Sequence, residues 1–215
     1  MVKYYPVLLN VSGLNCQVVG GGEVAARKVA GLLECGAAVR IIGPEACLAL
    51  QQFVQAGKIT WEKRPYRQGD LKGAGLVIAA TDDSQVNLAA SEDAHRAGIP
   101  VNVVDDAVKS SFILPAVLRR GDIIVAVSTS GRSPALARKL RTRLEQEFGE
   151  EYDTLTRVVD DVRQDLKRKG LRISSEVWQQ ALDVDQLIVL IREGRLEAAR
   201  ELILDRIIAA GVPNL

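Results

Sequence analysis

The chain has 215 residues and is 47% hydrophobic, which suits one large domain or one domain with a smaller appendage. Its 28 basic and 27 acidic residues nearly cancel, which argues against non-specific binding to nucleic acid, and no apolar run approaches the ~20 residues needed to span a bilayer. One histidine and three scattered cysteines argue against a His/Cys metal site and suit a reducing compartment, so we expect a cytoplasmic protein that holds no metal.

Short apolar runs alternate with helical stretches through the first half of the chain. Strands are predicted at 15–19, 38–42, 58–63, 76–80 and 101–104, with helices at 24–34, 46–56 and 85–97. Because strands separated by helices pair in parallel with right-handed crossovers, this half predicts a Rossmann-type α/β domain with a doubly wound parallel sheet.

The pattern changes after residue 106. A strand at 117–120 and a buried-looking strand at 123–128 precede a helix that Ser133 caps and Pro134 opens. That helix has an apolar stripe made of Leu136, Leu140, Leu144 and Phe148. From residue 152 onward the sequence is helical, with breaks at Gly170, Gly194 and Gly211. We therefore predict a small α+β segment followed by a C-terminal helical domain.

The glycine run after the first strand has the G-x-G-x-x-[GA] spacing of a dinucleotide-binding loop. Gly20 allows a tight turn, Gly22 has no Cβ and lets the backbone approach a pyrophosphate, and Ala25 keeps the helix close to the sheet. The N-terminus of the helix then faces the anion. The alternative is a glycine turn without a ligand, which the strand–loop–helix context disfavours.

The residues after the second strand bear on which dinucleotide is bound. Glu45 lies just beyond this strand, where it could reach a ribose, and no arginine directly follows the strand to hold a 2′-phosphate. The sequence therefore favours NAD over NADP. The predicted cofactor contacts are Gly20, Gly22, Glu23, Val24, Pro44, Glu45 and Thr81.

Three further motifs follow the glycine loop along the sequence. Residues 20–28 read GGGEVAARK, residues 79–87 contain ATDD and Asn87, residues 102–116 contain NVVDD, Phe112 and PA, and residues 128–134 read STSGRSP. Together they resemble the precorrin-2 dehydrogenases of siroheme biosynthesis, in their stand-alone form. Each motif is weak by itself, but the match runs in register from residue 5 to residue 145.

The resemblance implies NAD-dependent oxidation of precorrin-2 to sirohydrochlorin by a homodimer whose chains interlock. It also implies an NAD-binding domain at 1–113, a dimerisation segment at 114–149 and a helical domain at 150–215. Two alternatives stay open. A bifunctional enzyme would also insert ferrous iron into sirohydrochlorin, and a non-catalytic NAD-sensing module would bind the cofactor without turnover.

Asp105 follows the last strand of the predicted sheet, at the carboxyl end where open α/β sheets bind ligands. By resemblance, the aspartate of the NVVD segment is tied to catalysis. We therefore predict that Asp105 accepts the proton when precorrin-2 loses a hydride to NAD. The residues alone would favour a turn-forming aspartate, and the role of neighbouring Asp106 stays open.

Other polar residues are candidates for contacts with the nicotinamide ribose or the carboxylate-rich substrate. Thr81 could bond the ribose, whereas Asp83 or Ser84 more simply caps the next helix. Hydroxyls and amides at a helix start can hold a carboxylate, so the predicted substrate contacts are Asn102, Ser128, Thr129, Ser130, Gly131 and Arg132. Propionate binding or a solvated helix face would each explain the basic cluster of Arg119, Arg120, Arg132, Arg138, Lys139, Arg141 and Arg143.

Overall fold

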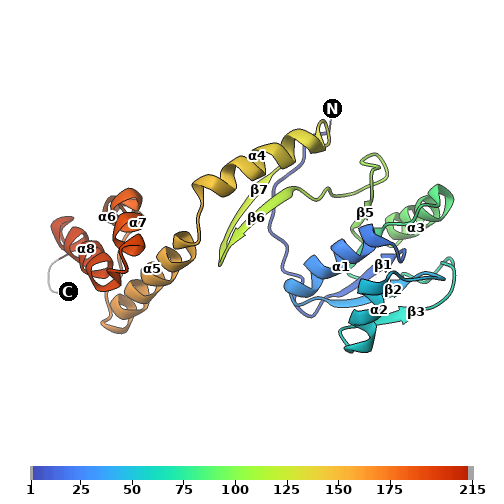
Figure 1. Cartoon of the computed structure of the whole chain (residues 1–215), viewed down its shortest axis with the longest axis horizontal. Helices are drawn as coiled ribbons and strands as arrows, with labels where there is room; N and C mark the ends of the chain where they lie inside the picture. The colour runs from blue at the N-terminus through green and yellow to red at the C-terminus, as the bar shows by residue number, and fades with distance from the viewer. Residues whose placement is uncertain (1, 213–215) are drawn as a thin grey trace. The chain divides into compact units, whose positions relative to one another are not determined.

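The computed structural model describes residues 2–212 and divides into two units, Met1–Leu114 and Pro115–Leu215. Figure 1 shows the α/β elements of the first unit in blue and green, and the elements of the second unit in yellow to red. Across residues 2–212, no helix is both long enough and apolar enough to cross a membrane.

The first unit is built on one five-stranded sheet in which every neighbouring pair of strands is parallel. The strands are β1 (Asn15–Val19), β2 (Ala38–Ile42), β3 (Ile59–Glu62), β4 (Leu76–Ala79) and β5 (Val101–Val103). Their spatial order is β3-β2-β1-β4-β5. The chain therefore winds outward from β1 to β3 and then returns to place β4 on the other side of β1.

Helices cover both faces of this sheet. They are α1 (Glu23–Glu34), α2 (Leu48–Gln55) and α3 (Ser84–Arg96). α1 and α2 share one core with Val18 of β1, and α3 shares the other core with Val19. Successive residues of β1 enter different cores because side chains alternate along a strand. The predicted Rossmann-type fold is confirmed, and each element end lies within two residues of its predicted position.

The second unit opens with a two-stranded antiparallel sheet, and a helix follows. These elements are β6 (Ala116–Arg120), β7 (Ile123–Val127) and α4 (Pro134–Glu147). Ser133 caps α4 by accepting a bond from the Leu136 amide, as predicted. The prediction of a buried strand at 123–128 is wrong. Among the described residues β7 pairs only with β6, and its side chains are half-buried or exposed.

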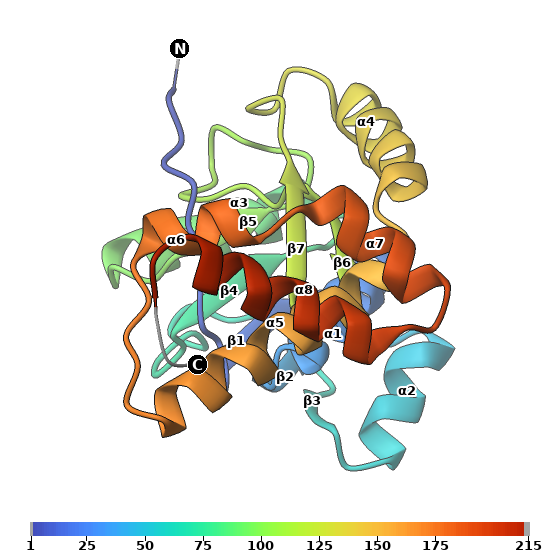
Figure 2. The ribbon, with the colours of Figure 1, turned by 90° about the vertical axis from the view of Figure 1, so that its left-hand side faces the viewer.

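The rest of the second unit is helical, as predicted, and is drawn in orange and red in Figure 2. Its helices are α5 (Glu151–Arg168), α6 (Ser175–Ala181), α7 (Val184–Arg192) and α8 (Leu196–Ala209). Gly170, Gly194 and Gly211 follow the ends of α5, α7 and α8, so the predicted breaks are confirmed. A further break at Leu182 has no glycine to signal it. It arises because Asp183 caps α7 by accepting a bond from the Gln186 amide.

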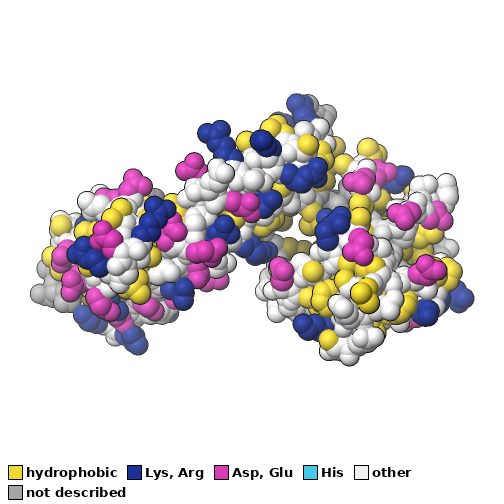
Figure 3. Space-filling view, viewed as in Figure 1, with side chains coloured by type: hydrophobic (Ala, Val, Ile, Leu, Met, Phe, Trp, Pro, Cys, Tyr) yellow, Lys and Arg dark blue, Asp and Glu magenta, His cyan; other side chains and the backbone are white. Residues whose placement is uncertain are grey.

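α4 leaves much of its predicted apolar stripe uncovered. Leu136 and Leu140 are 49% and 40% exposed. Basic side chains gather over the same helix in Figure 3, and those that α4 contributes are Arg138, Lys139, Arg141 and Arg143. By contrast, the core of the helical end fully buries Val162, Leu187 and Ile203. α4 therefore presents a surface that is both apolar and basic.

Candidate functional site

The carboxyl ends of β1 and β4 meet where the strand order reverses, which is the position at which open α/β sheets bind ligands. Gly20 follows β1 with a φ of +124°, a conformation that L side chains rarely adopt. A Cβ on Gly20 would lie 2.3 Å from the Ala80 carbonyl oxygen. Only glycine therefore lets the backbone after β1 come this close to the end of β4.

Gly21 makes a second close approach, toward the loop after β2. A Cβ on Gly21 would lie 1.8 Å from the Glu45 carbonyl oxygen. The Gly21 carbonyl also accepts a bond of 2.7 Å from the Cys47 amide, just before α2. The loop pattern alone gives roles to Gly20 and Gly22. The only sign of a role for Gly21 in the sequence is that the glycine run is uninterrupted.

Gly22 is the N-cap of α1 and differs from the two glycines before it. Its φ of −81° suits any residue, and a Cβ built on it would meet no described atom within 4 Å. Because glycine has no side-chain acceptor, Gly22 cannot cap the first amides of α1. Unbonded amides beside open space at a helix start suit a pyrophosphate, so the residues present fit a dinucleotide.

The other predicted cofactor residues lie around this loop. Glu23 and Val24 begin α1, where Glu23 is exposed and Val24 is half-buried. Pro44 and Glu45 are exposed in the loop that Gly21 contacts. These residues share the edge formed by the carboxyl ends of β1 and β2, although their contacts with a cofactor stay predictions.

Thr81 follows β4 and is tied to the start of α3. Asn87 Oδ1 lies 3.1 Å from Thr81 N and 2.9 Å from Thr81 Oγ1, and Asn87 Nδ2 donates to the Thr81 carbonyl at 2.8 Å. Asp83 accepts bonds from the Gln85 and Val86 amides, which confirms its predicted role as a helix cap. Thr81 is thus held firmly beside the glycine loop, and its bond to a ribose stays a prediction.

Asp105 lies two residues beyond β5, exposed and in the left-handed conformation with a φ of +60°. The Val104 amide donates to the Ala79 carbonyl at 2.9 Å, which brings this turn beside the end of β4. Burial, followed by the Arg27 charge, lowers the pKa of Lys28 on α1, and the Asp105 carboxylate opposes that shift. The Asp105 carboxylate therefore lies close enough to Lys28 on α1 to act on its charge. The sequence contains Lys28 in the glycine-loop segment but does not indicate this link.

The predicted substrate residues divide between the two units. Asn102 lies inside β5, 8% exposed, and its side-chain amide donates to the Phe112 carbonyl at 3.0 Å. Residues 128–132 form the turn between β7 and α4 in the second unit. Within this turn the Ser128 hydroxyl accepts from the Ser130 amide at 3.1 Å, and the Thr129 hydroxyl accepts from the Ser133 amide at 2.9 Å. Both sets of bonds support the local backbone.

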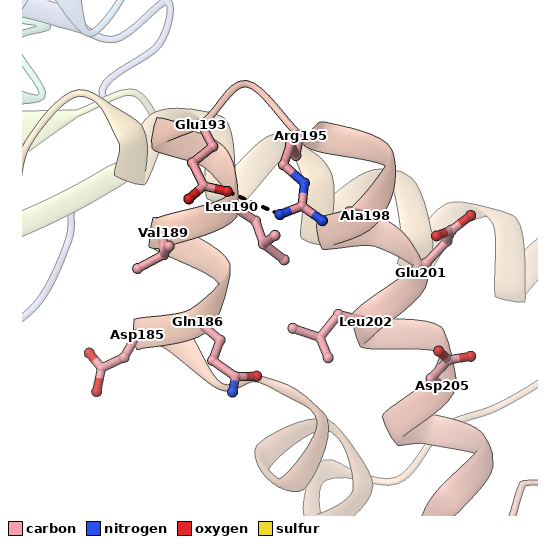
Figure 4. Close-up of a pocket in the computed structure, with 10 residues that line it drawn as sticks. All are labelled: Asp185, Gln186, Val189, Leu190, Glu193, Arg195, Ala198, Glu201, Leu202 and Asp205. Carbon is pink, nitrogen blue, oxygen red and sulfur yellow. Dashed lines mark hydrogen bonds and ion pairs between the residues drawn. The ribbon is translucent and has the colours of Figure 1, made fainter.

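A groove of about 600 Å³ between α7 and α8 is a candidate of another kind. Figure 4 shows its lining, which includes the carboxylates of Asp185, Glu193, Glu201 and Asp205. Arg195 is the one cation among the lining residues, and it is paired with Glu193. Such a surface repels anions, so it does not suit a carboxylate-rich substrate. Within residues 2–212 there is also no group of three or more His, Cys, Asp or Glu residues that could hold a metal.

The parallel sheet, the glycine-built strand ends and the open start of α1 define an NAD(P)-binding Rossmann unit. The family model described as putative NAD(P)-binding matches residues 7–116, more than half of the chain, and the chain belongs to this family. A second model, for the central part of sirohaem biosynthesis proteins, matches residues 120–147.

The chain is similar to curated siroheme synthases, which confirms the resemblance found in the four motifs. It is 40% identical over 211 residues to the siroheme synthase of Methylococcus capsulatus, covering 97% of this chain and 44% of the relative. It is 36% identical to that of Photorhabdus laumondii, covering 93% and 43%. The chain thus spans less than half the length of these relatives. The solved structure of the precorrin-2 dehydrogenase SirC shares the fold, with a TM-score of 0.70 and 24% identity over 96% of this chain and 100% of that one.

Replacing Gly21 with alanine should destabilise the first unit. The new Cβ would fall 1.8 Å from the Glu45 carbonyl oxygen, a backbone atom that cannot rotate away. We expect the free energy of unfolding to fall by about 1–3 kcal/mol, measured by urea denaturation. Gly22→Ala is the matched control and should lower it by at most about 1 kcal/mol, the usual cost of alanine at an N-cap, because its Cβ enters open space. Equal losses in the two variants would contradict this assignment.

Proposed function

We propose that this chain oxidises precorrin-2 to sirohydrochlorin with NAD as the acceptor. The observation that carries the proposal is the grouping of the glycine loop, Thr81 and Asp105 at the carboxyl ends of β1, β4 and β5, which are neighbours in the sheet. The siroheme synthases that match nearly the whole chain, and the precorrin-2 dehydrogenase that shares its fold, support the choice of substrate.

The oxidation removes a hydride and a proton from the reduced macrocycle. NAD, when bound, supplies the group that takes the hydride. The proton needs a base, and we assign this role to Asp105. Its carboxylate is exposed beyond β5, and no side-chain hydrogen bond within residues 2–212 occupies it. Thr81, held by Asn87, would orient the cofactor from the end of β4.

The carboxylates of the substrate need cations or amides to offset their charge. We assign this task to residues 128–132 and to exposed cations on α4, Arg138, Lys139 and Arg143. Arg141 already forms an ion pair with Glu145 on the same helix, so we assign it to the helix surface. Asn102 is a weaker candidate, because its amide is buried and bonded to Phe112.

The preference for NAD over NADP rests on the loop after β2. Glu45 is exposed there, and a carboxylate beside a ribose favours the 2′-hydroxyl and repels a 2′-phosphate.

We further propose a cytoplasmic homodimer organised as a cofactor domain at 1–113, a dimerisation segment at 114–149 and a helical domain at 150–215. The exposed leucines of α4 support the middle assignment. A two-stranded sheet with one helix buries too little apolar surface to be stable by itself. Pairing with a second copy would cover both the helix and the strand edges.

Gly22→Asp should abolish NAD binding without loss of folding. Aspartate is a preferred N-cap residue, and the space around Gly22 is open, so stability should stay level or rise by up to about 1 kcal/mol. The carboxylate would repel the pyrophosphate. Calorimetric titration should detect no binding at millimolar NAD. Gly22→Asn, which caps the helix without a charge, should retain part of the affinity, and unchanged affinity in Gly22→Asp would show that the loop is only a turn.

Asp105→Asn should reduce NADH formation from precorrin-2 by about 10²–10⁴-fold, the usual loss for a positioned general base. Asparagine tolerates the left-handed backbone, so NAD affinity should stay near that of the wild type. Asp122→Asn, in the exposed turn between β6 and β7, is the control. A wild-type rate in Asp105→Asn would remove Asp105 as the base.

The same assay on the wild-type chain tests the two alternative functions. Binding of NAD without turnover would favour the sensing module, and insertion of iron into the product would favour the bifunctional enzyme.

Sedimentation at micromolar concentration should give twice the 23.3 kDa mass of the chain. Leu140→Glu should shift the protein to monomer, because Leu140 is 40% exposed on α4 and a buried carboxylate is costly. Leu196→Glu on α8 is the matched control, since Leu196 is exposed to a similar degree, 44%. A wild-type chain that sediments only as a monomer would remove the dimer proposal.

A further inference from the structure

We propose that Asp106 is a positioning residue that holds the Asp105 backbone, and therefore the Asp105 carboxylate, in its working orientation. This inference rests on the proposed function, since it assigns Asp106 a task in the same reaction. It separates two adjacent aspartates into different roles. Asp105 would meet the substrate, and Asp106 would act only through Asp105.

The evidence begins with the Asp106 side chain, which turns back onto its own loop. Its Oδ1 accepts bonds of 3.1 Å from both the Val108 and the Lys109 amides. Its Oδ2 forms an ion pair of 2.8 Å with Lys109 Nζ. We call Asp106 Oδ1 and its two amide donors the Asp106 clasp. The Lys109 ammonium, helped by these amides, lowers the pKa of Asp106, so the clasp is intact at neutral pH.

Ser110 fastens the same turn to β5. Its hydroxyl accepts a bond of 2.8 Å from the Val103 amide and donates one of 2.7 Å to the Asp106 carbonyl. The Asp106 amide in turn donates to the Val103 carbonyl at 3.2 Å. On the other side of Asp105, the Val104 amide is bonded to the Ala79 carbonyl. Both neighbours of Asp105 are therefore anchored to the sheet.

The far end of the loop is anchored to α3. The Ser91 hydroxyl donates to the Lys109 carbonyl at 2.6 Å, and His95 Nε2 lies 3.2 Å from the same oxygen. The Asp106 clasp thus joins a residue bonded to β5 with a residue bonded to α3. The loop is anchored to two elements, and the clasp connects the two anchored residues alongside the Ser110 hydroxyl.

The conformation of Asp105 explains why the connection matters. Its φ of +60° is unfavourable for a residue with a Cβ, so the backbone relaxes unless its surroundings hold it. Removal of the clasp opens the turn between Asp106 and Lys109 and leaves the Asp105 backbone held only by the main-chain bonds of Val104 and Asp106 and by the Ser110 hydroxyl. A misplacement of about 1 Å at a reacting group can cost as much as ~10²-fold in rate. Loss of the clasp should therefore reach the chemistry even though Asp106 touches no substrate.

The test compares two substitutions at Asp106 with a matched one elsewhere. Asp106→Ala removes the clasp, whereas Asp106→Asn keeps an Oδ1 acceptor for both amides and loses only the ion pair with Lys109. Asp70→Ala is the matched control. Asp70 also accepts from a loop amide, that of Arg67 at 2.8 Å, and pairs with an arginine, but it lies in a different loop, between β3 and β4.

Three quantities are measured on the full chain: NADH formation from precorrin-2, NAD affinity by calorimetry, and amide hydrogen exchange at Val108 and Lys109 by NMR. Asp106→Ala should lower kcat by about 10- to 100-fold at unchanged NAD affinity, with faster exchange at both amides. Asp106→Asn should recover kcat to within about threefold of wild type and protect the amides again. Asp70→Ala should leave kcat and both amides unchanged.

The outcomes separate this inference from the proposed function. An active wild type with an equally active Asp106→Ala overturns the positioning role alone. Equal losses of kcat in Asp106→Ala and Asp70→Ala, or no recovery in Asp106→Asn, would show that the clasp contributes only to folding. Either result also overturns the positioning role. A wild-type chain that forms no NADH overturns the proposed function, and with it any catalytic task for Asp106.

Discussion

The backbone after β1 can approach two other strand ends because Gly20 and Gly21 carry no Cβ. One side-chain atom at Gly20 would strike the Ala80 carbonyl oxygen, and one at Gly21 would strike the Glu45 carbonyl oxygen. Either collision would push β4 or the loop after β2 away from β1. The strand ends that carry Thr81 and Asp105 would then move away from the glycine loop. The dinucleotide loop and the candidate base therefore depend on the same pair of backbone contacts.

Most polar side chains at this edge of the sheet make structural hydrogen bonds. The Asp105 carboxylate differs from them. Asn87 is bonded to Thr81 on both sides of its amide, Asp83 caps α3, and Asp106 closes the turn after β5. Within residues 2–212, no such bond engages the Asp105 carboxylate. A carboxylate that is exposed and unbonded can exchange a proton with a ligand, whereas one already saturated by amides serves better as support.

The two parts of the second unit bury very different amounts of apolar surface. Its helices α5 to α8 bury a core of their own, with Leu187 and Ile203 fully enclosed. The segment before them buries little beyond Leu118 and Ala137, which are 2% and 6% exposed. On α4, Leu136 and Leu140 and the cations Arg138, Lys139 and Arg143 are exposed instead. This imbalance between the two parts of one unit is the physical basis for the assembly and substrate roles that we propose for α4.

The sequence by itself determined the order and kind of the elements, the glycine loop, the cap at Ser133 and a cap at Asp83 or Ser84, because these features depend on residues close together along the chain. It also placed Asp105 at a strand end. Only the tertiary structure decided that Gly21 must be glycine, that β7 is half-buried, that Lys28 feels the Asp105 charge and that the Asp105 backbone is left-handed. Each of these depends on atoms brought together from distant parts of the chain, or on how many neighbours pack against an element. Neither can be predicted from a local sequence pattern.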